Sequence, residues 1–178
     1  MHRHSCRSFD RRIPLDQELT TIATAGLAAP SGRNQQPWRI ILVKDQVLIR
    51  ELAQEGLQNL AVNNPELHET ILSRGGGLFY GAPCLYIVSI DPANNFSGCN
   101  CGIVCQNMAL AAASLGLGSV ICATAGQAFA GSRKAEFAQR LHFPQGYTFG
   151  MALLVGHPTK LGTPHELDPG KFICIQAE

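Results

Sequence analysis

The first side chains able to do chemistry lie near the start of the chain, where Arg3, Ser5 and Arg7 occupy alternate positions. In an extended segment alternate side chains point to one side, so two guanidinium groups and a hydroxyl would face the same ligand. Guanidinium groups bind phosphate oxygens through paired hydrogen bonds, so this basic cluster (Arg3, Ser5 and Arg7) suits a terminal phosphate. The alternative interpretation is an ordinary basic terminus, solvated and frayed.

A second group of polar side chains lies in a short loop, the Ser31 turn (residues 30–36). Amides and hydroxyls on a rigid loop can meet the hydrogen-bonding edge of a planar heterocycle. Pro37 is expected to hold Gln36 extended. The alternative is a loop that only leads into a strand, with Trp38 filling the core.

Three cysteines close together, Cys99, Cys101 and Cys105, raise the question of a metal site. Zinc and iron–sulfur sites use paired C-x-x-C spacings, which these residues lack. The chain has 7 cysteines, an odd number, so they cannot all pair within the chain. We expect free thiols in a reducing compartment and no bound metal.

Hydrophobic periodicity and turn residues predict the elements that must position these groups. Helices are expected over residues 14–28, 47–59, 65–73, 101–115 and 132–141, and strands over 38–43, 83–90, 119–123 and 147–155. Asp16 is expected to cap the first helix. The helix over 101–115 is apolar on nearly every side, which predicts that protein encloses it. Gly75–Gly77 is interpreted as a hinge or turn. The order predicts a mixed α+β layered fold.

Composition limits the function classes. The 178 residues suit one domain, 1–178, with 156–178 as a C-terminal arm. Charged residues make up only 15% of the chain, so a subunit interface is expected to cover apolar surface. A formal net charge of +1 argues against nucleic acid, and no apolar run could cross a membrane. The N-terminus lacks a secretory signal, which predicts a cytoplasmic protein.

Taken together and in order, the motifs resemble the nitroreductase family along essentially the whole chain. The matching segments are Arg3-His4-Ser5-x-Arg7-x-Phe9, Ala29-Pro30-Ser31-x-x-Asn34-x-Gln36-Pro37-Trp38, Phe79-Tyr80-Gly81-Ala82-Pro83, Cys101–Met108 with Ser114–Ser119, and Gly146-Tyr147 with Leu154–Pro158. The resemblance implies a central, mixed but mainly antiparallel sheet flanked by helices, in an intertwined homodimer with two FMN sites at the subunit interface.

The resemblance also implies the site residues. Arg3, Ser5 and Arg7 would hold the FMN phosphate and the flavin edge, with His4 contributing mainly backbone. Pro30, Ser31, Gly32 and Asn34 would approach the flavin from the partner subunit, with Gln36 near them. Cys122 and Ala123 would lie beside the ring. A basic residue of the arm would complete the phosphate site, with Lys171 preferred to Lys160.

The implied function is an FMN-dependent oxidoreductase. NADH or NADPH would pass hydride to flavin N5, and a nitroaromatic, quinone or enone acceptor would then take its place, which predicts ping-pong kinetics. The flavin carries the chemistry, so no catalytic residue of the protein is expected. The alternative is a non-catalytic FMN-binding protein, a sensor or storage protein on the same scaffold. The sequence leaves open the physiological acceptor, the preferred nicotinamide, and whether a helix usual in relatives before Arg3 is missing.

Overall fold

Four antiparallel strands form the centre of the computed structural model, which describes residues 3–75, 77–160 and 162–175. They are β1 (Trp38–Val43), β2 (Cys84–Ile90), β3 (Gly118–Cys122) and β4 (Thr148–Gly156), in the spatial order β1-β2-β4-β3. The expected α+β layered fold is confirmed. Parallel pairing in the described residues comes from one isolated bridge, between Ser5 and Ser119.

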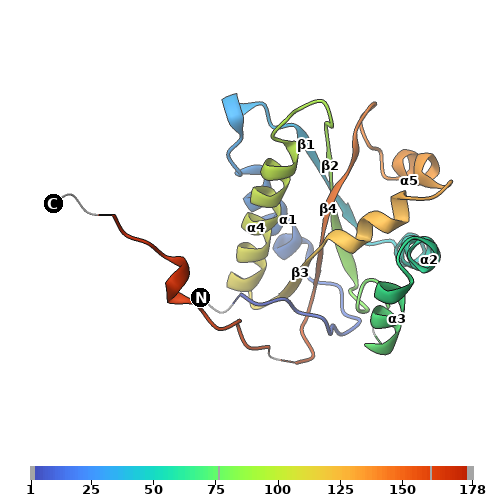
Figure 1. Ribbon diagram of the computed structural model, residues 1–178, viewed down its shortest axis with the longest axis horizontal. Helices are drawn as coiled ribbons and strands as arrows, with labels where there is room; N and C mark the ends of the chain where they lie inside the picture. Colours follow the sequence, from blue (N-terminus) through green and yellow to red (C-terminus); the bar gives the residue numbers. More distant parts are fainter. Residues whose placement is uncertain (1–2, 76, 161, 176–178) are drawn as a thin grey trace.

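Helices cover both faces of this sheet (Figure 1). On one face lie α1 (Asp16–Leu27) and α4 (Ser97–Ser114). On the other lie α2 (Gln46–Asn63), α3 (Pro65–Ser73), α5 (Lys134–Arg140) and the 3₁₀ segment η2 (Ala123–Phe129). Two further 3₁₀ turns are η1 (Gly32–Asn34) and η3 (Pro169–Lys171).

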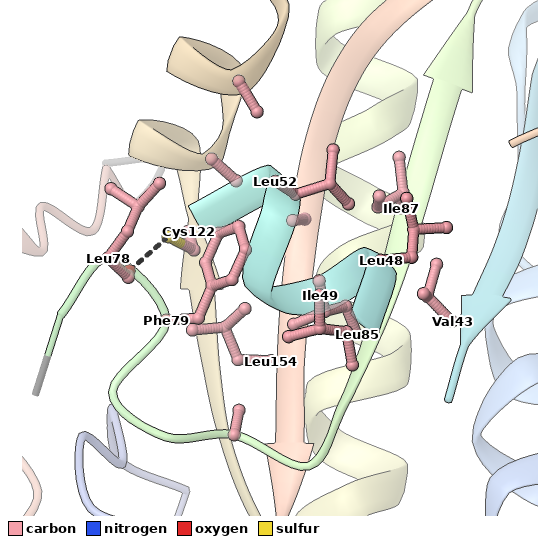
Figure 2. Packing of buried hydrophobic residues seen from close by; sticks show 14 of the residues in the cluster. Val43, Leu48, Ile49, Leu52, Leu78, Phe79, Leu85, Ile87, Cys122 and Leu154 are labelled. Atoms are coloured by element: carbon pink, nitrogen blue, oxygen red, sulfur yellow. Dashed lines mark hydrogen bonds between the residues drawn. The ribbon is translucent and has the colours of Figure 1, made fainter. Parts of the chain in front are cut away.

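The alternation of side chains along the strands builds a core on each face of the sheet. Leu85 and Ile87 of β2 pack with α2, as Figure 2 shows, whereas Tyr86 between them packs with α1 and α4. The Tyr86 hydroxyl donates a 2.6 Å hydrogen bond to the backbone oxygen of Leu19, which ties α1 to the sheet. The two cores hold α4 and β3 in place, and both elements border the candidate site.

The predicted helices and strands are all present, with ends that agree or are shifted by at most four residues. The two largest shifts are at the end of α2, which continues to Asn63 rather than Asn59, and at the start of α4, which begins at Ser97 rather than Cys101. The Asn94 side chain accepts a hydrogen bond from the backbone N–H of Phe96 at 3.0 Å and turns the chain into the helix earlier. The 3₁₀ segment η2 was not predicted.

The predicted cap of the first helix is wrong. Leu15, not Asp16, is the N-cap residue, and the Glu18 carboxylate accepts a hydrogen bond from the Leu15 backbone N–H at 2.8 Å. Asp16 lies in the first turn and instead forms an ion pair with Lys44 at 2.7 Å. The carboxylate three residues into the helix has therefore taken the role expected of Asp16.

One side of α4 is open within the single chain, so the chain alone does not provide the enclosure predicted for this helix. The residues on this open face, at spacings of four and three, are Cys99, Ile103, Gln106, Leu110 and Ala113, which are exposed or only partly buried. Added Cβ atoms at Gly98 and Gly102 would meet nothing within 4 Å. An alternating four–three spacing is typical of helices that pack along a partner helix.

The C-terminal arm leaves the layered body after β4 and extends away from it (Figure 1). Every described residue from 162 to 175 is exposed. Four of them are large and apolar, namely Leu167, Phe172, Ile173 and Ile175, with exposed fractions of 79–93%. An apolar extension of this kind is typical of a segment that packs on another chain.

Glu51 on α2 joins α5 to the body through ion pairs with Arg140 at 2.6 Å and Arg133 at 3.0 Å. Hydrogen bonds from Arg140, and then from Arg133, lower the pKa of Glu51 from 4.5 to about 2. Because the pKa is lower in the folded state, this stabilisation is complete above pH 4.5 and is lost as the pH falls toward 2.

We therefore expect the Glu51→Gln variant to unfold at a lower temperature than the wild type at pH 7. The difference should shrink below pH 4.5 and vanish near pH 2, as measured by thermal unfolding followed by circular dichroism. Glu69→Gln, at an exposed position of α3, is the control and should show no such pH-dependent difference. A difference that stays constant down to pH 2 would contradict the assigned pKa.

Candidate functional site

The N-terminal segment (residues 3–10) lies along the outer edge of β3 and pairs with it at one isolated bridge. The Cys6 backbone N–H donates to the Ser119 carbonyl at 2.9 Å, and the Ser5–Ser119 bridge is parallel. Farther on, the Asp10 backbone N–H donates to the His157 carbonyl at 3.0 Å. The segment is therefore clamped between β3 and the residues that follow β4.

Alternation in this segment places the basic cluster as predicted from its spacing. Cys6 is buried against the sheet, whereas Ser5 and Arg7 on either side of it are exposed. Arg3 and Arg7 line one shared hollow, together with His4, Ser5, Thr163 and His165. The cluster thus presents two guanidinium groups to one space.

A third cation lies next to the basic cluster. Lys160 lines an adjoining hollow with Ser5 and Arg7. Lys171 lies instead on the exposed arm, in a hollow formed by residues of the arm itself. Within one chain, therefore, Lys160 lies beside the basic cluster and Lys171 does not, although the sequence analysis preferred Lys171 for the phosphate site.

His4 and the start of the arm are also joined. The His4 Nε2 atom accepts a hydrogen bond from the Gly162 backbone N–H at 3.2 Å. This contact brings Thr163 and His165 toward Arg3 and Arg7. Sequence reasoning gave His165 no role, because nothing in its spacing signals that the chain returns to the N-terminal segment.

Cys122 and Ala123 lie where β3 ends and η2 begins, alongside Arg7. Ala123 is exposed, and Cys122 is buried beside Leu78 (Figure 2). Burial raises the pKa of the Cys122 thiol, while its contact with Thr124 and the charge of Arg7 lower it in part. The thiol stays protonated near neutral pH, so Cys122 is unsuited to act as a nucleophile.

The Ser31 turn is held by its own hydrogen bonds in a strained conformation. The Ser31 hydroxyl accepts from the Gln36 backbone N–H at 2.9 Å, and the Gln36 side-chain amide donates to Asn34 at 3.0 Å. Three non-glycine residues, Arg33, Asn34 and Gln36, have φ angles of 54°, 53° and 47°. Strained residues of this kind gather at functional sites.

The prediction that Gln36 is extended is wrong. Its positive φ places it in the left-handed region despite the following Pro37. The Gln36 backbone N–H is turned back onto the Ser31 hydroxyl. The Trp38 backbone N–H donates to the Gln36 carbonyl at 2.8 Å, which closes a three-residue turn centred on Pro37. Trp38 itself is buried and belongs to the core.

The basic cluster and the Ser31 turn lie at opposite ends of α4 in the single chain. Arg3 lines a hollow with Ala113 and Gly116, at the C-terminal end of the helix. A Cβ at Gly32 would lie 3.9 Å from the Phe96 ring, at the N-terminal end. An 18-residue helix is about 27 Å long, so the two groups cannot meet within one chain.

The cysteine cluster considered as a metal site lies on α4. Cys101 and Cys105 are buried and share a hydrogen bond, whereas Cys99 is exposed. That hydrogen bond, together with burial, raises the pKa of Cys105. Within the described ranges, no three His, Cys, Asp or Glu residues are grouped so as to hold a metal ion. No helix in those ranges is long and apolar enough to span a membrane.

Comparison with known proteins decides the family. The nitroreductase family profile matches residues 1–157. The chain belongs to the nitroreductase family. A crystal structure of a nitroreductase with bound FMN from Desulfitobacterium hafniense is 45% identical, has a TM-score of 0.95, and aligns over 98% of this chain and 95% of that one. A second FMN-bound nitroreductase, from Bacteroides fragilis, is 26% identical with a TM-score of 0.87 over 98% and 95% of the two chains.

A curated relative from Methanothermobacter thermautotrophicus is 30% identical over 123 residues, which is 66% of this chain. Its name gives it a provisional NADH dehydrogenase or NAD(P)H nitroreductase activity. The aligned region spans 55% of that relative and 61% of a second one from Archaeoglobus fulgidus. The predicted family is thus confirmed, whereas the assigned site residues remain predictions.

The geometry of the basic cluster depends on a close approach at Gly118. A Cβ there would lie 2.7 Å from Cys6 Sγ and 2.9 Å from Cys6 Cβ. We expect Gly118→Ala to push the N-terminal segment off β3, so that the amides of residues 3–10 exchange with solvent at least tenfold faster. Hydrogen exchange measured by mass spectrometry would detect this change.

Val62→Ala is the control, because Val62 is an 81% exposed residue of α2, away from the N-terminal segment and from the open face of α4. It should leave exchange in residues 3–10 at the wild-type rate. Equal protection of these residues in Gly118→Ala and the wild type would show that the close approach does not hold the segment.

Proposed function

We propose that this protein is an FMN-dependent oxidoreductase that transfers hydride from NADH or NADPH to an electron-poor small molecule, in a site shared by two copies of the chain. The observation that carries the proposal is the separation of the basic cluster and the Ser31 turn along α4. Two copies related by a twofold axis, with their α4 helices antiparallel, would bring the basic cluster of one copy to the Ser31 turn of the other.

Two further features support a homodimer. The open face of α4 has the spacing of a helix that packs on a partner helix. The apolar arm has no cover within its own chain over residues 162–175. A second copy accounts for both exposed surfaces.

The donor set fits FMN. Arg3 and Arg7, with Lys160 beside them, supply the positive charge that a phosphate monoester needs. The Ser31 turn supplies amide and hydroxyl groups on a rigid loop, which suits the polar edge of a flavin ring. The chemistry that FMN supplies when bound is the acceptance and donation of hydride.

The protein's own residues would bind FMN, orient it and shield it. Arg7, beside the end of β3, would place positive charge where negative charge develops on the ring. Ala123, exposed next to it, leaves room for a flat group at this edge of the sheet. Cys122 is buried and burial raises the pKa of its thiol, so this residue is unsuited to act as a nucleophile toward a bound group.

Purified protein should be yellow, release FMN on denaturation, and oxidise NADH or NADPH in the presence of a quinone. Since donor and acceptor would use the same space in turn, initial-rate plots at several acceptor concentrations should give parallel lines. A colourless protein that fails to take up added FMN would refute the proposal. Intersecting lines would refute the proposal that donor and acceptor use the same space in turn.

The shared site can be tested with variants of the two halves. Arg7→Gln and Asn34→Gly should each weaken FMN binding about tenfold or more, through loss of a charge-assisted hydrogen bond and of an amide contact. Glycine at 34 keeps the positive φ, so the turn itself should survive. A purified heterodimer of the two variants should regain one intact site and bind about one FMN per dimer.

The control is a heterodimer of Arg7→Gln with Arg3→Gln, in which both changes lie in the same half of the site. Each of its two sites then carries one defect, and FMN binding should stay weak. Equally weak binding in both heterodimers would mean that each site is built from a single chain.

A further inference from the structure

Phe96 is exposed at a position where an apolar ring brings no advantage to the fold. It is the N-cap residue of α4, yet its side chain makes no capping hydrogen bond, and the residue is 64% exposed. Ser, Thr, Asp and Asn are preferred at this position because their side chains satisfy the free N–H groups of the first turn. A residue that breaks a local rule without a local gain is expected at functional sites.

Phe96 is fixed to the Ser31 turn. The Asn94 side chain accepts from the Phe96 backbone N–H at 3.0 Å and donates to the Gln35 side chain at 2.9 Å. The Asp91 backbone N–H donates to the Pro37 carbonyl at 3.1 Å. These bonds join the loop before α4 to the turn, and the Phe96 ring lies 3.9 Å from the Cβ position of Gly32.

The geometry points to Phe96 as a specificity-determining residue, contributed by one subunit to the acceptor pocket of the other, where its ring selects flat aromatic acceptors. This inference rests on the proposed function, because it needs the Ser31 turn to meet the flavin of the partner subunit. Because these hydrogen bonds hold Phe96 next to the Ser31 turn, the ring would enter the same site as the turn. An exposed aromatic ring at the edge of the flavin would stack on a second ring or pack edge to face with it.

Flat aromatic acceptors are the substrates that would gain the most binding affinity from an aromatic ring in this position. A ring contact of this kind changes affinity by about two- to twelvefold beyond the effect of burying apolar surface. An acceptor without a ring, such as ferricyanide, has no comparable contact to lose. The ratio of kcat/KM for an aromatic acceptor to that for ferricyanide therefore isolates the contribution of Phe96.

The experiment uses the FMN-loaded dimer with para-dinitrobenzene and ferricyanide as acceptors. We expect the kcat/KM ratio of para-dinitrobenzene to ferricyanide to fall about tenfold in Phe96→Ala and about fivefold in Phe96→Leu, and to be largely kept in Phe96→Trp. The Kd of para-dinitrobenzene for the oxidised holoenzyme, followed by perturbation of the flavin absorbance, should rise in the same order. Leu72→Ala, which truncates an exposed side chain of α3, should leave the ratio unchanged.

Several results would overturn the inference. Equal losses with both acceptors would show that Phe96 only maintains the site, and an unchanged ratio in all three variants would place the ring outside the pocket. Loss of the dimer in Phe96→Leu and Phe96→Trp would assign the ring to the subunit interface instead. Failure of the proposed function is distinguishable, because the wild-type protein itself would then bind no FMN or fail to oxidise NADH and NADPH.

Discussion

The length of α4 is the constraint on which the rest of the site depends. The helix rises about 1.5 Å per residue and is packed against both α1 and the sheet, so it holds its two ends apart as a rigid spacer. The basic cluster lies at one end and the Ser31 turn at the other. A site that needs both must take them from two chains. Binding of FMN across the interface would then also stabilise the dimer, because a ligand that binds only the assembled form shifts the equilibrium toward it.

The basic cluster lies in the N-terminal segment, which belongs to no helix or regular strand and so needs other elements to hold it in place. The structure solves this by pairing the N-terminal segment with β3 and with the residues after β4, through the backbone bonds of Cys6, Asp10 and Thr159. Gly118 makes the pairing possible, since no larger residue would leave room for Cys6. Order at the N-terminus therefore comes from two segments that lie more than 100 residues away in sequence.

That long-range origin explains what the sequence could and could not predict. The helices and strands followed from periodicity, because amphipathic spacing is a local property. The early start of α4 depended on the Asn94 side chain, and the positive φ of Gln36 on the hydrogen bond that its backbone N–H donates to Ser31. Local rules therefore gave the wrong answer at both places. Lys160 and His165 lie near the basic cluster only because the chain that follows β4 returns to the N-terminal segment. The family resemblance supplied the candidate residues, and the tertiary structure supplied their distances.

The Ser31 turn keeps side chains at backbone positions where glycine would be less strained. Left-handed backbone costs a residue with a Cβ atom about 1–2 kcal/mol, and glycine would avoid that cost. The chain instead keeps Arg33, Asn34 and Gln36 in this conformation, with only Asn well suited to it. If the turn served only to connect α1 with β1, glycine would be the better residue at 33 and 36. What the strained positions gain is a set of exposed polar side chains in a turn that is held by the hydrogen bonds of Ser31 and Asn94.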